Sequence, residues 1–380
     1  MAATDLAGTS REQQGNERLD VGAYAFEGGV MPTDRLVTRL FVAQGTPQQL
    51  ADGADESEYL GRSFFTPLSW LDDALDYIRA VRKTRLADAD THFEILIAGG
   101  TYVPSQRRPD ATTPGHDKRQ NSYVIPPYVS LYGGFSGEET YSSRATGDNV
   151  QYANLESIPL MSGNQAVTCD EPIKDILDRR QASDFNQNGI EEPWELAQQT
   201  ILSGHLNASA KERNAYHVIY TSGSSAHPVV LDGLTVMGGE TDNVLSEVAK
   251  RDERGRGGGV YANGVPYVIN RCRFVGNRAV RGGAIYVRNA RLSLANTILA
   301  GNGTVDDATS ESKAQPPRGG AVYVASVGND TEAALYAANT LWVNNESTGA
   351  GGAFATNFVD GGIVTERAPR VSLTEQHLCA

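Results

Sequence analysis

One segment of the chain has the residue types and spacing of a calcium-binding loop. Between Asp184 and Glu195 the sequence places aspartate first, asparagine at the third and fifth positions, glycine at the sixth and glutamate at the twelfth. In such a loop, alternating oxygen atoms wrap the ion, the glycine (here Gly189) permits a sharp turn, and one ligand is a backbone carbonyl. We therefore predict a structural calcium site. Its predicted ligands are Asp184, Asn186, Asn188, Ile190, Glu192 and Glu195.

Three features of this segment depart from the calcium-loop template. Glu191 occupies a position that is usually apolar, Pro193 lies inside the loop, and the preceding residues do not have the pattern of a regular helix. A solvated turn rich in asparagine and glycine is the alternative interpretation.

Three arginines recur in a context that predicts a ladder of positive charge. Arg256, Arg281 and Arg318 each stand directly before a pair of glycines. If the segments around them stack, the three guanidinium groups lie along one edge and repel one another, so they need anions. Local carboxylates or an acidic ligand such as a uronate polymer would supply these anions.

A column of tyrosines is expected beside the arginines. The residue before each tyrosine is aliphatic and suits an interior, which predicts that the tyrosine side chains point outward. Together, tyrosine and arginine form a candidate sugar-binding surface. The preferred interpretation is that they stabilise a sheet through cross-strand aromatic contacts and local ion pairs. The four tyrosines are Tyr220, Tyr261, Tyr286 and Tyr323.

Glycine pairs recur in the last third of the chain, each of the first two followed by an asparagine 20 residues after its first glycine, and this repeat would position the arginine ladder. The pairs begin at Gly257, Gly282, Gly319 and Gly351, and asparagines follow at Asn277, Asn302 and Asn345. A fixed period indicates a stack of small units. Successive backbones in such a stack lie only about 4.8 Å apart, so each corner needs the freedom of glycine. The asparagines are expected to form a hydrogen-bonded ladder.

Apolar residues also recur at fixed offsets of three and then two positions. An offset of three breaks the alternation of a strand, so the chain must bend there. Two short strands that meet at a bend, repeated about every 25 residues, are typical of a coil of a parallel β-helix. The predicted columns are Leu231, Ile269, Leu294 and Ala337; Leu234, Cys272, Thr297 and Thr340; and Val236, Phe274, Leu299 and Trp342.

One amphipathic helix is expected before the run of strands. Apolar residues between Leu71 and Val81 have helical spacing, and Ser69 is a candidate N-cap. Such a helix would cover the first open edge of the stack. Short strands are expected around Phe93 to Ala98, Val129 to Tyr132 and Thr200 to Ser203.

Composition limits the classes of function. A net charge of −13 disfavours nucleic acid as a partner, because phosphate backbones require a basic surface. Three cysteines, an odd and sparse set, form no disulfide framework, and Cys272 is expected to be a small core residue. No apolar stretch approaches the ~20 residues of a membrane helix, so we expect no membrane insertion.

These repeats resemble those of the chlamydial polymorphic outer membrane protein family. That family is recognised by a Gly-Gly-Ala-Ile motif, matched by Gly282 to Ile285, and a Phe-x-x-Asn motif, matched by Phe274 to Asn277. Leu299 and Trp342 replace the phenylalanine in other repeats. Similar domains occur in large secreted bacterial proteins with the pectin-lyase-like fold. The resemblance implies an all-β, right-handed parallel β-helix with an N-terminal capping α-helix and a long loop insertion.

The domain organisation follows from the resemblance, which covers residues 36–380. Residues 1–35 are expected to be the tail of a preceding β-helix domain and a linker. The β-helix is divided into a cap (36–82), early coils (93–144), an insertion (145–198) and coils (200–380) that end in mid-coil. We therefore expect a piece of a longer protein. Its predicted location is extracellular, or at the bacterial cell surface or outer membrane.

The expected function is that of a non-catalytic, structural or adhesive repeat domain of an adhesin-like protein. Its partner would be a polysaccharide or a host or cell-surface protein. The alternative is a polysaccharide lyase or glycoside hydrolase on the same scaffold. Hydrolases of this fold use grouped aspartates, and lyases use calcium-held acids with a lysine or arginine base. No clustered aspartate pair recurs on neighbouring repeats, and the six histidines lack metal-ligand spacing. We therefore predict no catalytic residue.

Overall fold

The fold is taken from a computed structural model of the chain. It describes residues 37–44, 61, 64, 67–83, 91–105, 118–138, 173, 177–178, 180–184, 187, 189, 191–206, 214–241, 255–305, 317–326, 333–357 and 370–379. The predicted tail over 1–35 lies outside this part of the chain.

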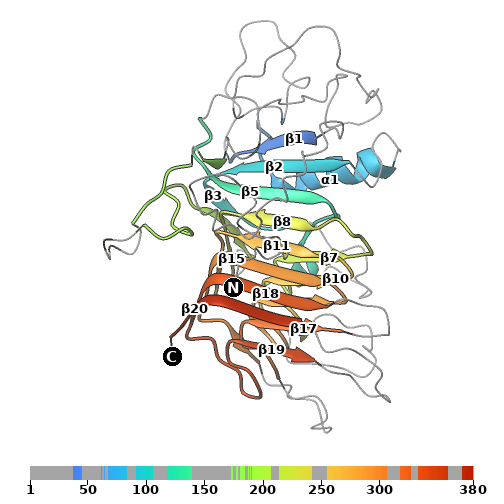
Figure 1. Cartoon of the computed structure of the whole chain (residues 1–380). Coiled ribbons are helices and arrows are strands. Elements are labelled where there is room, and N and C mark those ends of the chain that lie inside the picture. Colours follow the sequence, from blue (N-terminus) through green and yellow to red (C-terminus); the bar gives the residue numbers. More distant parts are fainter. Residues whose placement is uncertain are drawn as a thin grey trace, which may run out of the picture.

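The described strands form three sheets, and every strand pair within them is parallel (Figure 1). The twelve-stranded sheet contains β1 (Val37–Val42), β2 (His92–Ala98), β3 (Gly100–Tyr102), β5 (Val129–Phe135), β6 (Thr200–Ser203), β8 (Val229–Asp232), β9 (Leu234–Met237), β11 (Tyr267–Asn270), β12 (Arg273–Val275), β15 (Arg291–Ala300), β18 (Ala334–Val343) and β20 (Arg370–Cys379). The six-stranded sheet contains β4 (Tyr123–Val124), β7 (Ile219–Ser222), β10 (Val260–Asn263), β14 (Ile285–Arg288), β17 (Val322–Ala325) and β19 (Phe354–Asn357). The two-stranded sheet contains β13 (Arg278–Ala279) and β16 (Gly303–Thr304).

The chain visits these sheets in a fixed order. After β7 come β8 and β9, and the next circuit repeats the order as β10, β11 and β12. Each strand pairs with its counterpart one circuit earlier: β10 with β7, β11 with β8 and β12 with β9. The long strands β15, β18 and β20 run through both halves of the twelve-stranded sheet and join them. We call the half with β2, β5, β8 and β11 the first wing, and the half with β6, β9 and β12 the second wing.

The predicted bend between the two wings is present. Gly233 and Arg271 stand between the paired short strands, and both have left-handed backbone conformations, with φ of 70° and 51°. Within the long strands the same place is taken by Asn296 and Asn339, with φ of 47° and 43°. Glycine and asparagine tolerate this conformation best. The offset of three in the apolar pattern therefore marks a real change of direction.

The predicted columns of core residues are in register. Phe274 pairs with Leu299, Leu299 with Trp342, and Ile269 with Leu294. Phe274, Leu299 and Leu294 are fully buried. Cys272 is also buried in the core, as expected.

Glycine is required at the corner that leads into the six-stranded sheet. Gly282 has φ of 60°, and a Cβ atom on Gly283 would lie 2.1 Å from the carbonyl oxygen of Gly320 in the next repeat. No side chain fits that contact, because the two backbones occupy the space. The glycine pairs therefore serve the architecture of the stack.

The helix α1 (Leu71–Lys83) matches the predicted amphipathic segment. Its apolar residues Leu71, Leu75 and Ile78 are buried, and the helix contacts β1, β2 and β4. Arg79 donates to the carbonyl oxygen of Val124 (2.8 Å), and Arg82 donates to that of Pro127 (2.7 Å). A single 3₁₀ turn, η3 (Lys118–Gln120), precedes β4. No helix in the described part of the chain is long and apolar enough to cross a membrane.

Candidate functional site

The four predicted tyrosines form a continuous stack across the six-stranded sheet. The register pairs Tyr220 with Tyr261, Tyr261 with Tyr286, and Tyr286 with Tyr323. Neighbouring ring centroids are 5.3, 5.5 and 5.6 Å apart, and the rings are within 9° of parallel. The rings lie outside the main core, as expected from their alternation, but each is at least 96% buried. They therefore offer no open ring face to a sugar.

The structure brings two of the three predicted arginines onto this tyrosine stack. Arg256, Arg281 and Arg318 align through bridges between successive repeats. The guanidinium carbon of Arg256 lies 5.4 Å from the ring centre of Tyr286, and that of Arg281 lies 5.6 Å from Tyr323. Arg256 and Arg281 thus each meet an aromatic face one repeat further on, a contact of about 0.5–1 kcal/mol. This arrangement favours the structural interpretation, and ligand binding by these residues stays a prediction.

The predicted asparagine ladder is present at the corner that precedes the glycine pairs. Asn302 Oδ1 accepts hydrogen bonds from the backbone N–H of Asn277 (3.0 Å) and from its amide Nδ2 (3.1 Å). Asn345 Oδ1 accepts the equivalent pair from Asn302, at 3.1 and 2.9 Å. The backbone N–H and the side-chain amide of Asn277 and Asn302 thereby each donate a hydrogen bond to the asparagine of the next repeat.

A second asparagine ladder lies at the bend between the wings and was not predicted. Asn296 Nδ2 donates to Asn270 Oδ1 (2.9 Å), and Asn339 Nδ2 donates to Asn296 Oδ1 (2.8 Å). The sequence could have predicted this ladder, because Asn296 and Asn339 occupy the position between the apolar columns where the chain must bend.

The calcium-loop segment is only partly described. Asp184 Oδ2 accepts the backbone N–H of Gly189 (2.8 Å), and Gly189 has φ of 85°, as the turn requires. The two ends of the segment meet where Ser183 N–H donates to the carbonyl oxygen of Glu195 (2.8 Å). Asn186, Asn188 and Ile190 lie outside the described residues. The calcium site therefore stays a prediction.

The predicted ligand Glu195 lies toward the sheet. It is 3% exposed. Burial lowers the pKa of Arg273 in β12, and the nearby Glu195 carboxylate opposes that change. Among the residues that the structure describes, no three histidine, cysteine, aspartate or glutamate side chains gather as a metal site would require.

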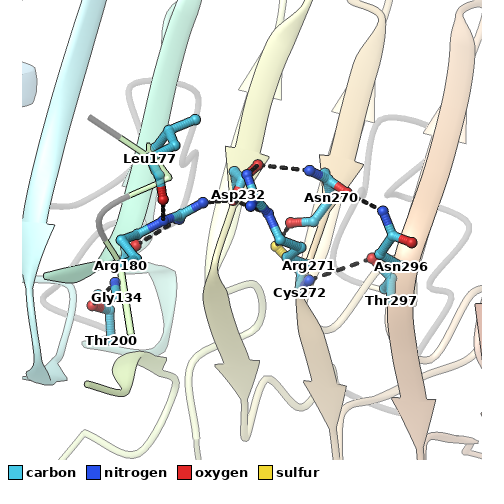
Figure 2. A network of polar contacts seen from close by, with 11 residues as sticks. Gly134, Leu177, Arg180, Thr200, Asp232, Asn270, Arg271, Cys272, Asn296 and Thr297 are labelled. Carbon is cyan, nitrogen blue, oxygen red and sulfur yellow. Dashed lines mark hydrogen bonds and ion pairs between the residues drawn. The ribbon is translucent and has the colours of Figure 1, made fainter. Parts of the chain in front are cut away.

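A buried charged network joins Arg180, which lies in the predicted insertion, to the twelve-stranded sheet (Figure 2). Arg180 donates to Asp232 Oδ1 (2.8 Å) and to the carbonyl oxygen of Gly133 (2.8 Å). Arg271 donates to both carboxylate oxygens of Asp232, at 3.1 and 3.0 Å, and Asn270 donates to Oδ2 (2.8 Å). This carboxylate at the end of β8 thus accepts four hydrogen bonds.

Two arginines determine the charge state of Asp232. Burial by itself would raise the pKa of this carboxyl, but Arg180 and Arg271 hold it below the usual 3.8. Burial lowers the pKa of Arg180, and Asp232 opposes that effect. A charged carboxylate between two guanidinium groups is the stable form of the network.

One further arrangement, on β2 and β5, has the residue types of a nucleophile, a base and an acid. His92 Nε2 lies 2.8 Å from Ser130 Oγ, and His92 Nδ1 lies 4.0 Å from Glu94 Oε1. Ser130 is fully buried, and Glu94 forms an ion pair with Arg39 of β1. Since a nucleophile must reach its substrate, this serine is out of position for catalysis.

The same cluster contains an aromatic stack. The ring of Tyr128 lies between His92, 4.6 Å away, and His227, 4.2 Å away. Tyr128 has φ of 60°, a strained conformation for an aromatic residue. Sequence reasoning missed this cluster because its members lie in β2 and next to β5 and β8, far apart in the sequence, and form no local motif.

Comparison with known proteins adds no identification: no family model, no curated protein and no solved structure matches the chain. The family relationship thus remains a resemblance based on the repeat motifs.

Proposed function

We propose that the chain is a non-catalytic structural and adhesive domain of an extracellular or cell-surface bacterial protein. Its scaffold in this proposal is a right-handed parallel β-helix like that of the chlamydial polymorphic outer membrane proteins. The observation that carries the proposal is the strict register of successive circuits. Phe274, Leu299 and Trp342 pair in one column, and asparagine ladders run beside it.

The handedness follows from a general property of parallel strands. A strand that crosses over and returns beside itself in parallel does so in a right-handed sense in about 98% of cases, because strands have an intrinsic right-handed twist. Each circuit from β7 to β10 to β14 repeats such a crossover. We therefore infer a right-handed coil.

The non-catalytic character is supported by where the polar side chains lie. The Asp232 network and the His92 cluster use hydrogen-bonding groups within the fold, and the guanidinium groups of Arg256 and Arg281 contact tyrosine rings. Tyr261 and Ser130 are fully buried. Polar groups that are satisfied internally stabilise a scaffold, whereas a catalytic group must meet its substrate. Adhesion to a polysaccharide or to a cell-surface protein is then a task for the outer surface.

One experiment separates this proposal from the enzyme alternative. The whole chain is incubated with a panel of acidic and neutral polysaccharides. New reducing ends and unsaturated uronates are then measured, and binding to the same glycans and to cell surfaces is followed in parallel. The expected result is binding to at least one glycan or cell surface without turnover. Turnover of any polysaccharide would overturn the proposal in favour of a lyase or hydrolase, and a chain that binds none of them would overturn the adhesive role.

A further inference from the structure

The outer surface of the second wing is aliphatic. Side chains alternate along its strands, so the neighbours of the buried residues Val236, Phe274, Leu299 and Trp342 point away from the core. Six of these outward neighbours are apolar and half-buried. We call them the aliphatic face: Met237, Val275, Ile298, Ala300, Leu341 and Val343.

The aliphatic face differs from the other outward surfaces. On the six-stranded sheet the outward residues are the tyrosines, which stack on one another and are buried. On the first wing, Leu96 and Tyr132 are buried in a cluster with Ile173 and Leu177, and Val268 and Ala295 are buried in a second cluster beside Val230. A parallel sheet is normally covered on both faces. The second wing therefore has the composition of a covered sheet face.

The residues of the aliphatic face lie in two columns, one of which also contains Thr235 and Arg273. The register aligns Met237, Val275, Ala300 and Val343 in one column. The other column contains Thr235, Arg273, Ile298 and Leu341, and the register continues it to Ile201 in β6 and His377 in β20. In β15, the large residue Ile298 lies two positions before the smaller Ala300. In β18, Leu341 likewise lies two positions before the smaller Val343.

We propose that this face pairs with the same face of a second copy of the chain. A two-fold axis parallel to the stacking direction, midway between the columns, places each strand opposite its own counterpart with reversed direction. Ile298 of one copy then meets Ala300 of the other, and Leu341 meets Val343. Large side chains fill the space above small ones, as in packed sheets about 10 Å apart.

The charge on this surface fits the same arrangement. Arg273 is the charged member of the two columns in β9, β12, β15 and β18, and the two-fold axis places it opposite Val275 rather than opposite a second arginine. Glu195 of the same chain lies close enough to Arg273 to influence its pKa. The negative charge of this carboxylate therefore partly balances the guanidinium group within each copy. A partner with a different face would not place a small side chain opposite each large one, as a second copy does for Ile298 and Leu341.

The size of the face sets the strength of the association. Four strands about 4.8 Å apart, each with two outward residues, cover roughly 300 Å². A standard interface uses about 800 Å² per partner. The pair is therefore weak and concentration-dependent, which suits copies displayed side by side at high local density.

The first test is the oligomeric state of the whole chain, measured by sedimentation velocity over a concentration series extending into the millimolar range. We expect reversible dimerisation. Ile298→Asp should weaken it by about tenfold or more, because a charge would be buried against Ala300 of the other copy. Ser222→Asp adds the same charge at an exposed position of β7 and should leave dimerisation unchanged. Circular dichroism checks that both variants fold.

A second test addresses the arrangement itself. In a background with Cys169 and Cys379 replaced by serine, chains with Ile298→Cys and chains with Ala300→Cys are prepared separately and then mixed. A short thiol crosslinker should join the mixed pair faster than either chain with itself. A monomer throughout the series, a dimer insensitive to Ile298→Asp, or equal crosslinking in all combinations would overturn the proposal.

Discussion

Arg180 and Asp232 form a buried ion pair across 52 residues of sequence, with 2.8 Å between Nη2 and Oδ1. Arg180 belongs to the insertion, and Asp232 ends a strand of the first wing. Both side chains are nearly inaccessible to solvent. The pair therefore determines where the insertion meets the stack, and its stabilising effect depends on the partners that surround it.

The first prediction concerns removal of the carboxylate charge. Asp232→Asn should lower the free energy of unfolding by about 3–5 kcal/mol, because it leaves Arg180 and Arg271 buried together without their anion. Urea denaturation monitored by tryptophan fluorescence measures the change. Glu191→Gln, in an exposed part of the same insertion, is the matched control and should change stability by less than about 0.5 kcal/mol.

The pH dependence of this pair follows from the lowered pKa of Asp232. A carboxyl whose pKa is lower in the folded state stabilises the fold above its unfolded pKa of about 3.8. That stabilisation is lost as the pH falls through the folded pKa. The wild type should thus lose the Asp232 contribution only below about pH 4, while Asp232→Asn should lack it at every pH. Equal stability of the two proteins at neutral pH would contradict this account.

The second prediction concerns His92, whose titration acts at higher pH. Burial, followed by the positive charges of Arg39 and Arg82, lowers its pKa from 6.5 to about 4. Between pH 6.5 and pH 4, His92 is protonated in the unfolded chain but not in the folded chain. The free energy of unfolding therefore decreases as the pH is lowered through this window. The loss should be at most ~3 kcal/mol.

Replacement of this histidine tests the assignment. His92→Gln should reduce the loss of stability between pH 7 and pH 4.5, measured by urea denaturation at each pH. His205→Gln, at an exposed position, should leave the pH dependence as in the wild type. If His92→Gln has the same pH dependence as the wild type, another group is responsible.

Local pattern in the sequence predicts most of the stack and little of what is attached to it. The columns through Phe274 and Trp342, the helix from Leu71 and the ladder from Asn277 to Asn345 follow from period and residue type. The columns and the ladder recur with the same residue types in successive repeats, and the apolar residues of the helix recur at helical spacing. Their register could therefore be predicted without coordinates.

The contacts that sequence reasoning missed join elements without a common period. Arg180 reaches Asp232 from an insertion, and His92 meets Ser130 from a neighbouring coil. The tyrosine column was predicted, but its burial was not, since alternation gives the direction of a side chain and not what covers it. The position of Arg281 against Tyr323 depends on side-chain conformation, which residue spacing does not determine.

The third prediction extends the tyrosine stack by one ring. Ala355 stands in register with Tyr323, in a half-buried position where the column of tyrosines ends, and Arg318 continues the arginine column beside it. Ala355→Tyr should raise the free energy of unfolding by about 0.5–1.5 kcal/mol through stacking on Tyr323. Thermal unfolding followed by circular dichroism measures the change. Ala355→Leu adds apolar volume without a π face and should stabilise less, whereas equal effects of the two substitutions would show that stacking is not the cause.

The last prediction concerns calcium. Asp184 is the first residue of the predicted loop, and its Oδ2 already accepts the N–H of Gly189, so the turn is formed around this carboxylate. Asp184→Ala should remove one charged ligand and weaken Ca²⁺ binding by at least about tenfold. Isothermal titration of wild type and variant with Ca²⁺ measures the difference. Glu191→Gln serves as control, because Glu191 is exposed in the same segment and is not a predicted ligand. Equal calcium affinity in wild type and Asp184→Ala would leave the solvated turn as the correct interpretation.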